Sequence, residues 1–283
     1  MRYDDLETLR VSRDDGLAIV TIDNPPLNIL DARLLSDLDR FAGRVREDEA
    51  VRVIVFQSAD PDFFIPHGDM NFIDDPDAFV SLPVALDEDP ALNPMQRVIE
   101  RVRKLPQATI GKLAGYARGG GAEFLAALDM RFAGREHGKI AQMETLTGII
   151  PGSGATVYLP PLMGRARTLE AILGAGLFDA PLAERYGWIN RAIPDGELDD
   201  FVLDLARRIA RLAPGVISAA KTAVDAMSAP MLGALKVQNE QLGVTFSQAA
   251  AGDLTRAALR AGAQTREGER HLEALLSGLP QAR

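Results

Sequence analysis

Short apolar runs alternate with an amphipathic segment over the first part of the chain. Residues 17–22 and 51–56 are short and rich in β-branched and other apolar side chains, which is typical of buried strands. Between them, apolar residues recur at helical spacing from Leu34 to Val45, and Asp31 stands where it can cap the helix N-terminus. The order strand, helix, strand predicts an α/β fold.

The pattern weakens over residues 74–94, where aspartates and prolines replace any regular period. This composition predicts a surface loop or lid. Asn93 and Pro94 then supply a cap and a first turn for a helix whose apolar residues lie between Val98 and Leu105. Further short strands are expected at residues 108–110, 130–133 and 189–193.

After about residue 196 the strand-like pattern ends. Pro214 and Gly252 punctuate this region as helix boundaries rather than as a linker, so we interpret it as a helical extension of one domain. The division is a core over residues 1–195 and a helical C-terminal region over residues 196–283. Four helices are expected there, at residues 201–212, 215–227, 231–250 and 253–276.

The composition argues against several classes of protein. The 283 residues have a net charge of −9 and dispersed basic side chains, which argues against nucleic-acid binding. No apolar run reaches the roughly 20 residues that span a bilayer, and the N-terminus lacks the features of a signal peptide, so a cytoplasmic protein without a membrane segment is expected. The chain has no cysteine, and His67, His137 and His271 are far apart in sequence, so we expect no metal site.

A glycine-rich segment over residues 115–123 is the first candidate for chemistry. An apolar strand pattern passes through three glycines into a helix-forming run, so N–H groups at a helix N-terminus can approach a phosphate, a carboxylate or an oxyanion closely. Glu123 lies one turn inside that helix, where its carboxylate could relay protons to a group polarised there. A tight turn, followed by a glutamate that compensates the helix dipole, explains the same residues without a function.

A second candidate is Glu144, the only formally charged residue between Ile140 and Tyr158. A lone acid among apolar residues is costly to bury, which indicates a role for it. One glutamate of a pair can give a proton while the other takes one next to a carbonyl group. Glu123 and Glu144 together therefore suggest lyase or isomerase chemistry.

With these motifs in this order, the chain resembles the crotonase superfamily, the enoyl-CoA hydratase and isomerase group, up to about residue 230. Residues 115–123 are similar to the family's G-x-x-x-G-G-G-x-E, and residues 144–152 to its E-x-x-x-G-x-x-P-G. The resemblance implies a spiral of ββα units with a helical C-terminal region that forms trimers, and hence a homotrimer or a dimer of trimers. Further family elements are matched at residues 24–30, 64–70 and 180–189.

The resemblance also implies a substrate and a site. An acyl-CoA would be bound with its thioester carbonyl between two backbone N–H groups, one from Gly120 and one from the position of Pro66. Hydratases of the family use two acids where Glu123 and Glu144 stand, and isomerases use the later one, so syn hydration of an α,β-unsaturated thioester is implied. CoA enters as part of the substrate, and no other cofactor is implied. Substrate contacts are implied for Leu27, Gly68, Asp69, Met70, Tyr116, Gly119, Met143 and Gly152.

The chain departs from the family pattern in ways that bear on the site. Proline has no N–H, so Pro66 would remove one oxyanion donor at a cost of about 10²- to 10³-fold in rate, unless His67 supplies a donor through its backbone or ring. An aromatic residue and a lysine that family members often carry near the C-terminus are replaced by Ala261 and Gln264, and the family's lysine after D-L is Asn71. The acids of the following loop would also oppose a polyanionic CoA, unless arginines elsewhere offset their charge.

Three functions therefore stay open from the sequence. The first is a hydratase-type lyase. The second keeps the fold and acts as an isomerase, a thioesterase or a carbon–carbon hydrolase, which Pro66 and the acidic loop favour. The third is a binding or scaffolding protein, expected if Glu123 and Glu144 pair with basic side chains away from any cavity. The trimer prediction also draws on apolar residues that either need a partner surface or close the monomer's own core, namely Leu232, Leu235, Leu242, Val244 and Phe246.

Overall fold

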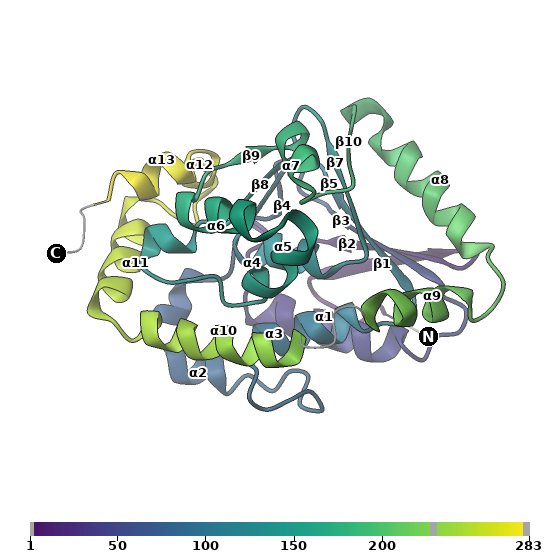
Figure 1. Cartoon of the computed structure of the whole chain (residues 1–283), viewed down its shortest axis with the longest axis horizontal. Helices are drawn as coiled ribbons and strands as arrows, with labels where there is room; N and C mark the ends of the chain where they lie inside the picture. The colour runs from purple at the N-terminus through teal and green to yellow at the C-terminus, as the bar shows by residue number, and fades with distance from the viewer. Residues whose placement is uncertain (1–2, 227–230, 280–283) are drawn as a thin grey trace.

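The computed structural model describes residues 3–226 and 231–279. Within these residues the chain forms four consecutive ββα units, each with two strands followed by a helix (Figure 1). In the last three units the first strand joins a large sheet and the second, shorter strand joins a smaller one. The alternation of strands and helices predicted from the sequence is confirmed, and the same ββα arrangement occurs in each unit.

The large sheet consists, in spatial order, of β1 (Leu9–Asp14), β2 (Leu17–Ile22), β3 (Val53–Ser58), β5 (Ala108–Leu113), β7 (Met130–Gly134) and β10 (Arg191–Ile193). Its pairs are parallel except for β1 with β2. One face packs on the first helices of the chain and the other on α8, so its middle strands are apolar on both sides. The covering helices are α1 (Ala32–Val45), α3 (Pro94–Arg103) and α4 (Gly120–Ala127) on one face and α8 (Leu198–Ala210) on the other.

The smaller sheet contains β4 (Phe63–Ile65), β6 (Tyr116–Arg118), β8 (Lys139–Ala141) and β9 (Phe178–Asp179), in that order. The first three of these strands run parallel, with Ala117 between Ile65 and Ile140. Parallel strands end at the same edge of a sheet, so the segments that follow these three strands meet there. Those segments contain the residues that the sequence marked as candidates for chemistry, among them Gly120 after β6 and Glu144 after β8.

The predicted helix starts are confirmed. Asp31 accepts a hydrogen bond from the Leu34 N–H at 2.9 Å and caps α1. Asn93 and Gln96 form a reciprocal capping box at the start of α3. The segment predicted as a loop before α3 is partly helical, because Asp75 caps a short helix there. This helix is α2 (Pro76–Val80), and η1 (Met70–Ile73) directly precedes the segment.

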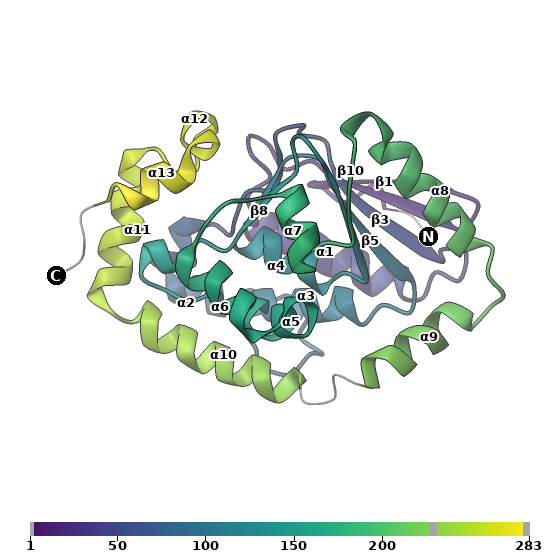
Figure 2. The ribbon, with the colours of Figure 1, turned by 45° about the horizontal axis from the view of Figure 1, so that its top comes forward.

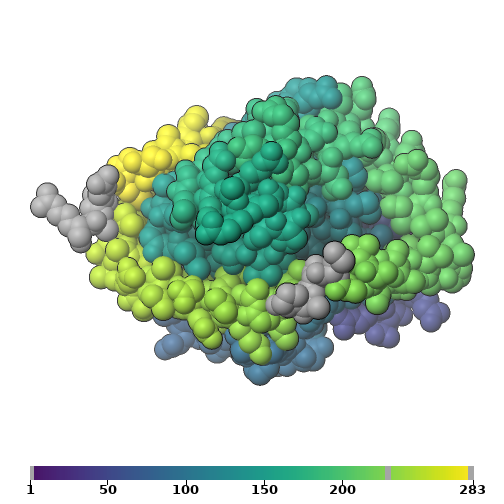
Figure 3. Space-filling model, viewed as in Figure 1, coloured from purple at the N-terminus to yellow at the C-terminus, as the bar shows by residue number. Residues whose placement is uncertain are grey.

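The segment between β8 and α8 contributes η2 (Glu144–Thr147), α5 (Ala155–Met163), α6 (Arg165–Gly174), α7 (Ala180–Tyr186) and η3 (Asp195–Glu197). The later helices form an arc around this part of the chain (Figures 2 and 3). They begin with α9 (Val216–Asp225), α10 (Met231–Phe246) and α11 (Ala249–Ala261). Two helices of this arc contact the segment that it surrounds: α10 contacts α5, and α11 contacts η2. The helix predicted over residues 215–227 has its last residue, Met227, outside the described residues.

The prediction of a single helix over residues 253–276 is wrong. Gly262 and Gln264 adopt left-handed conformations, with φ of 111° and 65°, which ends α11 and turns the chain. Two short helices follow, α12 (Arg266–Arg270) and α13 (Leu272–Ser277). In the described ranges 3–226 and 231–279, no helix combines the length and apolar character required to cross a membrane.

Candidate active site

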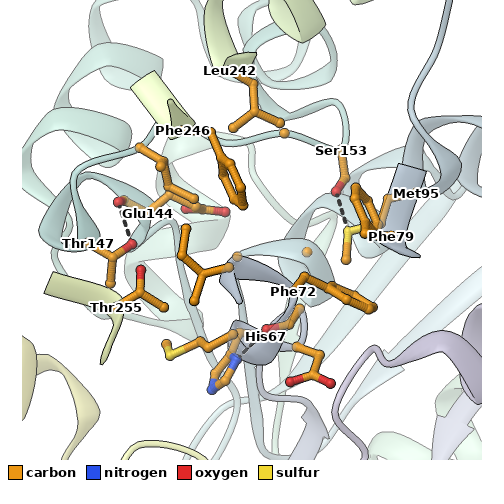
Figure 4. A pocket seen from close by; sticks show the side chains of 18 of the residues that line it. His67, Phe72, Phe79, Met95, Glu144, Thr147, Ser153, Leu242, Phe246 and Thr255 are labelled. Atoms are coloured by element: carbon orange, nitrogen blue, oxygen red, sulfur yellow. Dashed lines mark hydrogen bonds between the residues drawn. The ribbon is translucent and has the colours of Figure 1, made fainter. Parts of the chain in front are cut away.

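The segments that follow β4, β6 and β8 enclose a cavity of about 140 Å³ (Figure 4). Gly68 follows β4, Gly119 and Gly120 follow β6, and Glu144 follows β8. All four line the cavity together with Glu123 of α4. The three parallel strands thus bring together motifs that are far apart in the sequence.

Glu123 is held by the start of α5. Its side chain is 1% exposed, and its Oε1 accepts hydrogen bonds from the backbone N–H groups of Ser153 and Ala155, both at 2.8 Å. Burial raises the pKa of the Glu123 carboxyl, while these N–H groups act in the opposite direction because they stabilise its charged form. The carboxylate therefore has a fixed orientation and two donors that favour its ionised state.

Glu144 begins η2, and its carboxylate lies against Gly119, since a Cβ at residue 119 would be 3.0 Å from Glu144 Oε1. Burial and the nearby charge of Glu123 raise the pKa of the Glu144 carboxyl well above its usual range. The side-chain amide of Gln142 lies 3.1 Å from both carboxylate oxygens and can donate to a carboxylate or accept from a protonated acid. The two glutamates thus differ, with Glu144 the one more strongly driven to hold a proton.

Side chains are excluded from the glycine turn that precedes Glu123. Gly119 has a φ of 48°, which favours glycine, and a Cβ at Gly121 would lie 2.1 Å from the Ile65 carbonyl oxygen. The tight-turn interpretation of these glycines is therefore correct. It is compatible with a function, because the same turn lets the backbone reach the cavity.

Two backbone N–H groups lie close together beside the two acids. Gly120 is the first residue of α4, where an N–H has no partner within the helix. The Leu30 N–H donates to the His67 carbonyl at 3.0 Å and the Asp69 N–H donates to the Leu30 carbonyl at 3.2 Å. The N–H of Gly68, between these two bonds, therefore points away from Leu30. A Cβ at Gly120 would be 3.5 Å from Gly68 N.

The structure corrects the placement of Pro66. This residue is buried and does not belong to the cavity wall formed by the described residues, whereas Gly68 lies beside Gly120. The physical reason is that the chain continues past β4 for two residues before Gly68 forms its bridge with Leu30. The missing N–H of Pro66 therefore removes no donor from this part of the cavity.

The ring of His67 is also not the replacement donor suggested by the sequence. Its Nδ1 lies 2.8 Å from the Gly68 carbonyl oxygen and its Nε2 lies 3.0 Å from Glu269 Oε1. Both nitrogens are thus engaged by the protein. His67 lies at the cavity wall with its ring bonded to the C-terminal region.

Most residues predicted to contact substrate line the cavity. Leu27 and Tyr116 do not: Leu27 is buried away from it, and Tyr116 packs on Phe63 and on Arg118, whose guanidinium carbon is 4.2 Å from the Tyr116 ring centroid. Those that do line the cavity are Gly68, Asp69, Met70, Gly119, Met143 and Gly152.

Apart from Met70 and Met143, the apolar part of the wall was not found from the sequence. Leu242 and Phe246 project into the cavity from α10, Phe72 faces it from η1, and Phe79 faces it from α2 in the segment predicted as a loop (Figure 4). Helical spacing marked α10 as a helix, but no local signal shows that it folds back over residues 68 and 144. Further apolar wall residues are Ile73, Met95 and Ile149.

Basic side chains from other elements of the fold offset part of the negative charge of the acidic loop. Four of its acids form ion pairs with basic residues of α3, α10 and α11 or the residue after α3, so much of the negative charge is balanced locally. The pairs are Asp74 with Arg256, Asp87 with Arg101, Glu88 with Lys104 and Asp89 with Lys236.

The surroundings of the acids oppose the scaffolding interpretation. Glu123 and Glu144 share one cavity, and among residues 3–226 and 231–279 no ion pair joins either of them to a basic side chain. In the same part of the chain, no group of three or more histidine, aspartate or glutamate side chains is arranged to hold a metal ion.

The repeated ββα units, the two sheets and the paired glutamates beside a glycine turn define an α/β protein of the crotonase type. Comparison with known proteins agrees with this class. Residues 12–256 match the family model described as enoyl-CoA hydratase/isomerase. The chain belongs to the enoyl-CoA hydratase/isomerase family, and the predicted fold class is confirmed.

Individual relatives extend over nearly the whole chain. A protein of Streptomyces avermitilis, provisionally described as an enoyl-CoA hydratase, has a crystal structure with a TM-score of 0.90 and 47% identity, covering 96% of this chain and 97% of that one. A short-chain-enoyl-CoA hydratase of Clostridium acetobutylicum is 26% identical over 86% of this chain and 91% of its own length. The structure of Pseudomonas aeruginosa DspI has a TM-score of 0.71 and 27% identity, covering 86% of this chain and 97% of that one.

Proposed function

We propose that the protein is an enzyme that adds water across the double bond of an α,β-unsaturated acyl-CoA thioester. The observation that carries this proposal is that Glu123 and Glu144 line one cavity beside the N-terminus of α4. Two acids at one site can deliver the two parts of a water molecule to adjacent carbons. An isomerase needs only one proton-transferring group and gives no reason for the second acid.

The environments of the two acids suggest their roles. Glu123, whose Oε1 accepts two N–H bonds, is the general base that takes a proton from water as the water oxygen bonds to the β-carbon. Glu144, with its raised pKa, is the general acid that gives its proton to the α-carbon. In the proposed reaction both acids act on the same face of the double bond, so the addition is syn. Exchange of protons with solvent then restores the starting states of the two acids.

The thioester oxygen becomes negatively charged as the β-carbon is attacked, and the N–H groups of Gly68 and Gly120 are its stabilising donors. Gly120 adds the positive end of the α4 dipole. This pair replaces the pair of Gly120 and Pro66 suggested by the sequence. The donors are backbone groups of two glycines, so no side chain stands between them and the substrate.

The cavity wall suggests an apolar acyl group, since Phe72, Phe79, Leu242 and Phe246 line it. Coenzyme A is the carrier, and no further cofactor takes part in the proposed reaction. A homotrimer or dimer of trimers is part of the proposal, with support from Leu232 and Val244, which are 41% and 56% exposed. The other three residues on which the prediction drew offer less support, because Leu235 is buried in this chain and Leu242 and Phe246 line its cavity.

The test is an assay of the purified protein with trans-2-enoyl-CoA substrates of increasing chain length, followed by mass spectrometry. Hydration yields a 3-hydroxyacyl-CoA that is heavier by one water molecule. Isomerisation leaves the mass unchanged, and thioester hydrolysis releases free CoA, so the alternative activities are separate outcomes. Absence of a hydrated product with every substrate would refute the proposal.

A further inference from the structure

A buried chain of charged side chains joins the C-terminal helices to the loop that carries Gly68. His67 Nε2 lies 3.0 Å from Oε1 of Glu269, a residue of α12 with 0% exposure. Arg118, at the end of β6, is equally buried, and its Nη2 donates to the Glu269 carbonyl at 3.0 Å. Its Nε donates to Glu273 of α13 at 2.5 Å. None of these side chains has a part in the reaction proposed above.

The contacts of His67 indicate an imidazolium. Its two ring nitrogens face a carbonyl oxygen and a carboxylate oxygen, both of which accept, so each nitrogen must carry a proton to bond them. Burial opposes this charge, but Glu269 and the Gly68 carbonyl together outweigh burial and raise the pKa of the His67 ring. The other charged groups on this side are Arg118 of β6, which acts against protonation, and Glu144 of η2 across Gly119.

The protonated ring acts directly on the backbone of the cavity wall. The His67 carbonyl accepts from Leu30, and the Gly68 carbonyl accepts from His67 Nδ1 at 2.8 Å. The peptide groups on both sides of Gly68 Cα are therefore held, and with them the direction of the Gly68 N–H. Gln264 ties the same loop to α12, since its side chain donates to Asp69 at 2.9 Å and its N–H donates to Glu269 at 2.7 Å.

We propose that Glu269 is a positioning residue: through the His67 imidazolium it holds the Gly68 N–H toward Gly120, so that the oxyanion site is complete only when α12 is docked. This inference rests on the proposed function, in which that N–H binds the thioester oxygen. An interior ion pair of this kind is a poor source of stability, because two desolvated charges cost about as much as they return. Precise placement of a donor is a better reason for it, since a displacement of about 1 Å can cost on the order of 10²-fold in rate.

The first experiment compares E269Q with E267Q, the same substitution at an exposed residue of the same helix. In E269Q the His67 ring loses its counter-charge and becomes neutral near pH 7. The amide oxygen is needed at the Oε1 position to accept from the Gln264 N–H, so a neutral ring faces two acceptors with one proton and loses one of its two hydrogen bonds. We expect kcat to fall by about 10- to 100-fold with KM nearly unchanged. The deficit should shrink as the pH is lowered and His67 regains its proton. E267Q should behave as the wild type at every pH.

The second experiment reads the charge of His67 without catalysis, by ¹⁵N NMR of the imidazole nitrogens. The chain has three histidines, and His67 is the buried one, whereas the side chains of His137 and His271 are 79% and 72% exposed. We expect His67 to be an imidazolium at pH 7 in the wild type and a neutral ring at that pH in E269Q. The double variant H67Q/E269Q removes both charges of the His67–Glu269 ion pair and leaves Arg118 paired with Glu273, so it should fold and keep the low kcat of E269Q.

Two results would overturn the inference: a neutral His67 in the wild type at pH 7, or a wild-type kcat in E269Q or in the double variant. Either result, obtained with an active wild type, leaves the proposed hydration intact. An inactive wild type would instead overturn the proposed function and the positioning role with it. The NMR titration would still report whether the His67–Glu269 ion pair exists.

Discussion

Replacing Glu123 by glutamine separates the chemistry of the site from its architecture. Glutamine has the shape of glutamate, and its Oε1 can accept the same two hydrogen bonds from the N–H groups of Ser153 and Ala155. The start of α5 should therefore keep its place. What the substitution removes is the negative charge and the ability to take a proton from water.

The expected loss of rate follows from the role of a general base, which contributes about 10²- to 10⁴-fold, or about 2.7–5.5 kcal/mol of transition-state free energy. The free energy of unfolding should change by less than about 1 kcal/mol, because two opposing effects nearly cancel. Hydrogen bonds to a neutral acceptor are weaker than those to a carboxylate. Against this, the variant no longer has to bury the charge of Glu123, a cost that raises the pKa of that carboxyl in the wild type. The repulsion between this charge and Glu144 is also gone.

The matched control is Glu100→Gln, at a glutamate that is 2% exposed and outside the cavity wall. Glu100 accepts from the Tyr158 hydroxyl at 2.6 Å and pairs with Arg103 at 2.7 Å, so its loss leaves Arg103 with the more distant, exposed Asp225 at 3.5 Å as counter-charge. We expect this variant to lose about 2–3 kcal/mol of stability, somewhat less than a fully buried pair would, and to keep its kcat. Hydration kinetics and urea denaturation measure both quantities. A rate for Glu123→Gln within tenfold of the wild type would refute the assignment of the base.

Glu144→Gln should lower kcat by about 10²- to 10⁴-fold and remove the alkaline limb of the pH–rate profile. The raised pKa keeps the wild-type acid protonated to higher pH, and activity is lost as the pH rises through that pKa; an alkaline limb that survives in the variant would assign it to another group. Leu242→Ala opens the cavity beside α10 and should shift the ratios of kcat/KM toward longer acyl chains, by about tenfold or more per accommodated methylene group; unchanged ratios would contradict the proposed acyl site. Gly121→Ala should lower the free energy of unfolding by about 1–3 kcal/mol or more, because the new Cβ would meet the Ile65 carbonyl at 2.1 Å. Gly174→Ala, where no atom lies within 4 Å, is its control, and equal stabilities of the two variants in urea denaturation would contradict the packing argument.

Local patterns were enough to predict five strands of the large sheet, β2, β3, β5, β7 and β10, and the helices α1 and α3, but not the short strands β4, β8 and β9. The apolar run of β2, the helical spacing after Asp31 and the cap at Asn93 each act within a few residues, and each is confirmed. The apolar pattern did not predict where a single residue changes the direction of the chain, as at Gly262. The apolar spacing continues through this left-handed turn, so the pattern gives no sign of it. The glycine turn and the two acids were also visible, since unusual residues stand out against an apolar background.

Only the tertiary structure decided how these parts combine. The parallel pairing of β4, β6 and β8 sets which residues after each strand face one another, and one bridge to Leu30 places Gly68, rather than Pro66, beside Gly120. The return of the chain over its own cavity brings Leu242 to the wall and Glu269 to His67, across 202 residues of sequence in the second case. Such contacts depend on the direction in which distant elements pack. A sequence period reports that a face will be buried, but not which surface will cover it, so the charge state of His67 could not be read before the fold was known.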